Sequence, residues 1–86
     1  MNKRWADSAW EDYLYWQSQD KKTLKKINEL IKDIDRNGVA VGIGKPEPLR
    51  YRKAWSRRID DRHRLVYDID ENGCLLIYSC YGHYED

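Results

Sequence analysis

The sequence predicts an α+β fold in which two N-terminal helices pack on one face of a small twisted antiparallel sheet. Three observations predict it. Apolar residues recur at helical spacing between residues 8 and 37. Two alternating runs flank the polar segment 60–62, as in a hairpin with a three-residue loop. A turn signal at residues 70–73 precedes a further apolar run over residues 74–81. At 86 residues, the chain forms one domain with a modest core.

The first predicted helix follows a short edge strand near residues 3–6. Ser8 and Glu11 have the spacing of a capping box, in which each side chain binds a free backbone amide. Residues at i, i+3, i+4 and i+7 form the expected buried face: Trp10, Tyr13, Leu14 and Gln17. Trp16 then lies on the far side, at the surface or in an interface.

The second predicted helix is capped by Asp20 and ends at Asn37-Gly38, residues that tolerate the left-handed conformation of a helix end. Its buried stripe is Leu24, Ile27, Ile31 and Ile34. Its opposite face carries basic side chains: Lys22, Lys25, Lys26, Lys32 and Arg36. Such a row is most often a solvated face, and it is also able to contact a large anion such as RNA.

The central hairpin joins residues 55–59 to residues 63–67. If Ile59 faces His63, Arg58 lies opposite Arg64. Like charges directly opposite each other destabilise a sheet, so this pair predicts an anion from outside the chain, or neutralisation by Asp60 or Asp68. The other face of the hairpin is expected to join the core: Trp55, Ile59, His63, Leu65 and Tyr67. His63 is therefore interpreted as structural.

The last predicted strand follows the turn at residues 70–73. A two- or four-residue loop directs Leu76, Tyr78 and Cys80 to the core face. The arginine face then receives Leu75, Ile77, Ser79 and Tyr81. If the strand continues past Gly82, His83 joins that face as well.

Glu47 lies between two prolines, which hold its backbone extended. It is either an exposed acid in a rigid turn or a carboxylate held as a general base beside a basic surface. Net charge is only +1, yet residues 45–64 contain eight basic and three acidic residues, a local +5. A carboxylate, two arginines and a histidine on one face can cleave RNA by acid–base attack of the 2′-hydroxyl. Nothing in the sequence indicates a metal site or a cofactor.

Cellular location is indicated by several absences. The sequence lacks an apolar run long enough for a membrane span, and the basic residues at its start are not followed by a signal-peptide core. Cys74 and Cys80 are too far apart to bridge each other. We therefore expect a reduced cytoplasmic protein with no membrane partner.

Blocks spread over nearly the whole chain resemble the YoeB/Txe toxins of the RelE/ParE superfamily. The blocks are residues 11–17, 25–33, 44–49, 55–59, 63–67 and the final His83-Tyr84 pair. The resemblance implies a single RelE-like toxin domain over residues 1–86. It also implies a metal-independent mRNA endonuclease that acts in the ribosomal A site and is silenced by a Phd/YefM-type antitoxin.

By matched position, the resemblance makes Glu47 the general base and His83 the general acid. Arg58 and Arg64 stabilise the phosphate, and Tyr84 orients the RNA. Contacts to RNA and the ribosome are expected from Lys22, Lys25, Lys26, Lys45, Arg50, Arg52 and Lys53. The chain departs from the family in its Glu85-Asp86 tail, in Gly82, and in a short segment 50–54.

The resemblance also implies partners. A homodimer is expected, and operator DNA is expected to bind only through the antitoxin. The antitoxin's C-terminal segment would cover the arginine face and its apolar residues. Two alternatives use the same fold: a ParE-like toxin that binds DNA gyrase, and a module that binds RNA without cleaving it.

Overall fold

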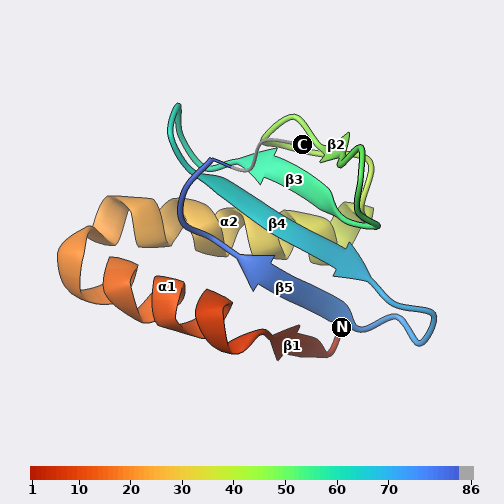
Figure 1. Cartoon of the computed structure of the whole chain (residues 1–86), viewed down its shortest axis with the longest axis horizontal. Coiled ribbons are helices and arrows are strands. Elements are labelled where there is room, and N and C mark those ends of the chain that lie inside the picture. The colour runs from red at the N-terminus through yellow and green to blue at the C-terminus, as the bar shows by residue number, and fades with distance from the viewer. Residues whose placement is uncertain (84–86) are drawn as a thin grey trace.

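The structure is a computed structural model, and it describes residues 1–83. Its seven elements are β1 (Lys3–Trp5), α1 (Asp7–Gln19), α2 (Lys21–Asn37), β2 (Glu47–Pro48), β3 (Trp55–Arg58), β4 (Arg64–Ile69) and β5 (Leu75–Ser79). The strands form one sheet in the order β1-β5-β4-β3-β2, and both helices lie on the same side of it (Figure 1). The α+β prediction is confirmed. The sheet is mixed, because β1 runs parallel to β5 while the other pairs are antiparallel.

The second helix forms as its sequence predicts. The Asp20 carboxylate caps it by accepting the backbone N–H groups of Lys22 and Thr23 at 3.1 and 3.3 Å. The helix ends at Gly38, whose φ of 85° is readily adopted by glycine. The apolar stripe is buried against the sheet and also includes a leucine that the prediction left out: Ile27, Leu30, Ile31 and Ile34.

The first helix is rotated relative to its prediction. Ala9 and Trp16 are its buried residues, whereas Trp10 and Leu14 are 46% and 42% exposed. This helix carries aromatic residues on all of its faces. A buried stripe that begins at Ala9 therefore fits the helical period as well as one that begins at Trp10. The capping box is also wrong: the helix begins at Asp7, and the Ser8 hydroxyl donates to the Tyr78 carbonyl instead.

The central hairpin has the predicted register. Trp55 pairs with Tyr67, Ser56 with Val66, and Arg58 with Arg64. The Asp60 carboxylate shapes the loop by accepting the backbone N–H groups of residues 62 and 63, each at 2.8 Å.

In the last strand, the side chains that face the core are the ones predicted to face outward, and the reverse. Three residues separate Asp70 from Cys74, whose carbonyl accepts the Asp70 amide at 3.0 Å, so that Ile69 pairs with Leu75. Gly73 supplies the left-handed residue of such a loop, with φ of 79°. Leu75 and Ile77 are therefore fully buried beneath the helices, while Leu76 and Tyr78 take the outer face.

A register shift between Val66 and Tyr67 pairs Val66 with Ser79. Cys80 is then buried in the core, as predicted. Tyr81 is not on the arginine face, because its ring contacts Trp16 on the helix side at 5.5 Å between centroids. The strand ends at Ser79, so strand parity does not place His83.

Three further observations concern membrane spans, metal ligands and cysteines. No helix has the length and apolar character needed to cross a membrane in residues 1–83. The same residues hold no cluster of three or more potential metal ligands. Both cysteines are free thiols.

Candidate functional site

The face of the sheet turned away from the helices gathers three of the predicted site residues. Glu47 pairs with Ser56, and Arg58 pairs with Arg64 on the adjoining strands. Directly paired residues share a face, and so do residues two apart on one strand. Glu47, Arg58 and Arg64 therefore lie on one surface, which we call the outer face, across β2, β3 and β4 (Figure 1).

Neither Asp60 nor Asp68 neutralises Arg58 or Arg64. Within residues 1–83 the ion pairs are Arg57–Asp33 and the N-terminus with Asp35, so neither Arg58 nor Arg64 has one there. Arg64 donates instead to the carbonyls of residues 60 and 63 at 2.6 and 3.1 Å. Two cationic side chains with Cβ atoms roughly 5 Å apart then repel each other, which favours an anion between them.

Glu47 is held close to these arginines by the loop before it. Lys45 has φ of 53°, and the carbonyl of Gly44 accepts the Arg58 amide at 2.7 Å. Gly44 has φ of 84°, and a Cβ there would also lie 2.8 Å from Leu30 Cδ2, so glycine suits this close crossing. The loop thus reaches the outer face at a fixed point, and the exposed Glu47 follows two residues later.

Arg57 is an important residue that the sequence reasoning missed. It is fully buried on the helix side of β3, where its Nε donates to the Tyr67 hydroxyl at 2.8 Å. Its remaining donors bind the Asp33 carboxylate at 2.5 Å and the carbonyls of residues 38, 41 and 43 at 2.8–3.1 Å. The hydrogen bond from Arg57 lowers the pKa of Asp33. Residue 57 lies between Trp55 and Ile59 in the alternation of the strand, so its side chain points to the same core face as theirs. That alternation is the signal from which the burial of Arg57 could have been predicted.

The backbone just before His83 is bound beside Arg64 by contacts other than the predicted strand extension. The Gly82 carbonyl accepts the Arg64 amide at 2.9 Å, and the Gly82 amide donates to His63 Nδ1 at 2.8 Å. His83 is exposed and follows directly. Tyr84 lies outside the described residues, so its predicted role is not placed by the structure.

The predicted RNA-binding residues form two separate groups. Arg50, Arg52 and Lys53 belong to the segment between β2 and β3, where the Arg52 guanidinium stacks over the Tyr78 ring at 4.1 Å on the outer face. Lys45 is exposed just before Glu47. The other group, which we call the α2 lysines, comprises Lys22, Lys25 and Lys26. Two of them line a hollow of about 320 Å³ between α2 and the loop of the hairpin, beside Ile59 and Asp60.

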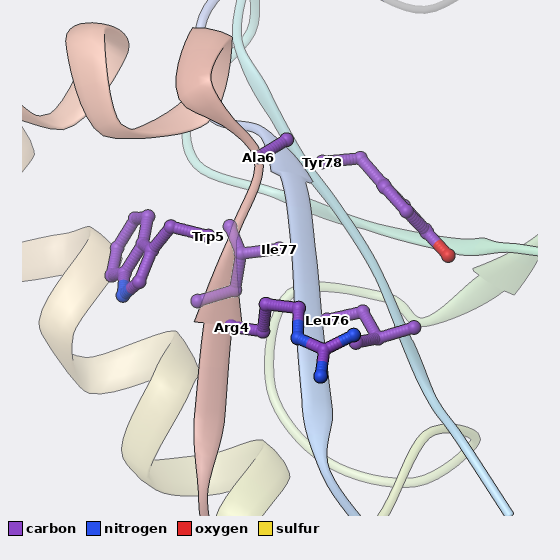
Figure 2. A pocket seen from close by; sticks show the side chains of 6 residues that line it. All are labelled: Arg4, Trp5, Ala6, Leu76, Ile77 and Tyr78. Carbon is purple, nitrogen blue, oxygen red and sulfur yellow. The ribbon is translucent and has the colours of Figure 1, made fainter.

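An apolar hollow lies beside this basic surface, at the β1 edge of the sheet. Its volume is about 220 Å³, and Figure 2 shows Leu76 and Tyr78 on one side of β5 with Trp5 on the other. Leu76 and Tyr78 therefore replace Leu75, Ile77 and Tyr81 as the apolar residues of the outer face. Arg4 also lines this hollow.

Comparison with known proteins identifies the family of this chain. The family model for the YoeB-like toxin of bacterial type II toxin–antitoxin systems matches residues 5–84. The chain belongs to this family. The YoeB toxin of Escherichia coli strain K12 is 52% identical over 86 residues, covering 98% of this chain and all of the relative.

Solved structures of YoeB proteins have the same fold. The YoeB–YefM complex from Staphylococcus aureus matches with a TM-score of 0.89 and 51% identity, over 98% of both chains. The YoeB dimer from the same organism matches with a TM-score of 0.91 and 51% identity, also over 98% of both chains. This chain is therefore a toxin of the type II toxin–antitoxin class.

Two further side chains of this YoeB-family toxin fix the segment that precedes His83. Cys80 donates its amide to the Asp12 carboxylate at 3.0 Å, and its carbonyl accepts Trp16 Nε1 at 2.8 Å. Burial raises the pKa of the Asp12 carboxyl, an effect that the Cys80 hydrogen bond opposes. Burial also raises the pKa of the Cys80 thiol to about 12, which keeps it protonated at neutral pH. Trp16 was expected at the surface or in an interface, and it is instead part of the core.

Proposed function

We propose that the chain is a ribosome-dependent endoribonuclease that cleaves mRNA in the ribosomal A site and thereby inhibits translation. The observation that carries this proposal is the facing pair Arg58 and Arg64, which has no carboxylate partner in residues 1–83 and shares its face with Glu47. Such a surface suits a phosphodiester, whose charge grows in the transition state.

The proposed reaction is an internal transesterification. Glu47 accepts the proton of the ribose 2′-hydroxyl, and the resulting oxygen attacks the adjacent phosphorus. Arg58 and Arg64 stabilise the added negative charge on the phosphorane. The bond from phosphorus to the 5′-oxygen of the next nucleotide then breaks, and His83 donates a proton to that leaving oxygen. Tyr84 is proposed to orient the RNA, and no cofactor is required.

The basic residues are proposed to bind the ribosome. Phosphate contacts position a protein on nucleic acid without reading its sequence. The α2 lysines would contact ribosomal RNA on one side of the molecule. Lys45, Arg50, Arg52 and Lys53 would contact RNA beside the outer face.

We propose a Phd/YefM-type antitoxin as the inhibitory partner, since the related YoeB is found in a complex with YefM. An antitoxin segment with acidic residues would neutralise Arg58 and Arg64, and its apolar residues would enter the hollow at Leu76 and Tyr78. Operator DNA would be bound through the antitoxin alone. The related YoeB dimer supports a proposed homodimer. Because the proposed target is the ribosome, we also propose a cytoplasmic location.

The test is single-turnover cleavage of mRNA on purified, programmed ribosomes. Arg64→Ala and His83→Gln are expected to slow cleavage by at least ~10², with ribosome binding near wild type. Glu47→Gln is expected to slow it less, because a phosphate oxygen could share the role of base. Arg62→Ala, an exposed arginine in the same hairpin loop, is the matched control and should cleave normally.

Wild-type protein that binds programmed ribosomes and leaves the mRNA intact would contradict the proposal. Inhibition of DNA gyrase by the same preparation would then favour the ParE-like alternative.

A further inference from the structure

The chain turns sharply between the end of β5 and His83, and three side chains from elsewhere in the fold hold this turn. Asp12 and Trp16 of α1 bind the amide and carbonyl of Cys80 at 3.0 and 2.8 Å. His63, from the hairpin, accepts the Gly82 amide at 2.8 Å. The Gly82 carbonyl in turn accepts the Arg64 amide at 2.9 Å. Gly82 is thus bound through both of its backbone polar groups to the two residues that begin the second hairpin segment.

The imidazole of His63 has little freedom to leave this position. Its ring lies 4.7 Å from the Trp16 ring at an interplanar angle of 75°, and 4.8 Å from the Tyr81 ring. A backbone N–H only donates, so Nδ1 must carry a lone pair. His63 therefore works in this arrangement as a neutral imidazole with its proton on Nε2.

We propose that His63 is a positioning residue for RNA cleavage: through Gly82 it fixes the point and direction from which His83 follows, beside Arg64. The inference rests on the proposed function, in which His83 is the general acid. It adds a residue that itself need not touch RNA. The sequence interpretation of His63 as a structural core residue is thereby extended to a role in the reaction.

Protonation of His63 removes the acceptor on which Gly82 depends. Ionisable groups that contact His63 or the turn it holds include Asp60 and Arg64 of the hairpin, Tyr81, and Asp12, which binds Cys80. The packed helix α1 also carries Asp7, Glu11, Tyr13 and Tyr15. An imidazolium at this site cannot accept the Gly82 amide. Protonation of this ring should therefore break the contact between His63 and the Gly82 amide.

Two substitutions separate the acceptor from the ring. His63→Asn places an amide oxygen near the position of Nδ1 and does not titrate. His63→Gln carries its amide oxygen one bond further out, near the position of Nε2, away from Gly82. The pair is matched in polarity and differs in where the acceptor lies.

The experiment measures hydrogen exchange of the Gly82 amide by NMR alongside single-turnover cleavage on programmed ribosomes. His63→Gln is expected to reduce Gly82 protection and the cleavage rate, each by at least about tenfold, with ribosome affinity unchanged, since small misplacements of a reacting group are costly. His63→Asn should retain both within about threefold, which a role in ring packing alone does not predict. In the wild type, the Gly82 amide shift should follow the titration of the His63 ring, and in His63→Asn it should not.

Three results would overturn the inference: a Gly82 amide equally protected in His63→Gln, a cleavage rate unaffected by loss of that protection, or a wild-type Gly82 shift that ignores His63 protonation. The last measurement needs no substitution, so it tests the contact on which the inference depends even if a variant fails to fold. Absence of cleavage by the wild type would instead reject the proposed nuclease function, and with it the catalytic part of this inference, whereas the NMR results would still report on the Gly82 contact.

Discussion

Replacing Arg57 with alanine is expected to be the most damaging single change on β3. The guanidinium is fully buried and donates to Tyr67, Asp33 and three loop carbonyls. Its removal leaves the Asp33 carboxylate, whose side chain is 13% exposed, without its cation. Breaking such a pair from one side costs about 3–5 kcal/mol. At about 0.05–0.15 kcal/mol per residue, a domain of this size is stable by roughly 4–13 kcal/mol, so Arg57→Ala removes a large share.

Urea unfolding followed by circular dichroism measures this loss. With a slope of roughly 1 kcal/mol per molar urea for a small domain, the midpoint should fall by about 3 M or more. Arg58→Ala is the matched control. Arg58 is exposed, so its replacement should change the free energy of unfolding by no more than about 0.5 kcal/mol. An Arg57→Ala variant within about 1 kcal/mol of wild type would refute the view that this arginine holds the loop over residues 38–44 to the sheet.

Three further predictions concern other parts of the chain. Asp33 has a pKa below its ordinary 3.8, so its stabilising contribution should be present above that pH and disappear as the pH falls through the folded-state value; urea midpoints from pH 6 to pH 2 should show this loss, and Asp33→Asn should abolish that part of it. Cys74 should react with iodoacetamide in the native state and Cys80 only on unfolding, as mass spectrometry of labelled peptides would show; equal labelling would contradict the protonated, buried thiol. Neutralising the three α2 lysines together should weaken ribosome binding for every codon and reduce its salt dependence, and an unchanged salt series would count against their proposed contact.

Local chemistry in the sequence is sufficient to predict α2 and the central hairpin. The stripe from Leu24 to Ile34 has one helical interpretation, and Asp20 and Gly38 mark its ends with residues suited to those positions. The three-residue loop after Ile59 sets the hairpin register, so Arg58 faces Arg64 as expected. These features depend on neighbours close in sequence.

The candidate site is only partly predictable for the same reason. Arg58 and Arg64 share a face because strand pairing preserves parity, which sequence alternation reveals. Glu47 joins that face through the pairing of β2 with β3, and the sequence did not predict a strand there. The proximity of Gly82 to Arg64 depends instead on where β5 ends and on the contacts of Trp16 and His63, residues distant in sequence. No local pattern encodes that meeting.

The sequence by itself determined the fold class, the second helix and the hairpin register, and it singled out the residues proposed to act on a phosphodiester. Only the tertiary structure decided which face of α1 is buried, which side chains of β5 face the core, and that Arg57 is buried. A shift of one residue changes which face of a helix or strand points to the core, and local preferences do not distinguish the two alternatives. Packing distinguishes them, because Trp16 must bind the Cys80 carbonyl and Asp33 must meet Arg57 when the helices close on the sheet.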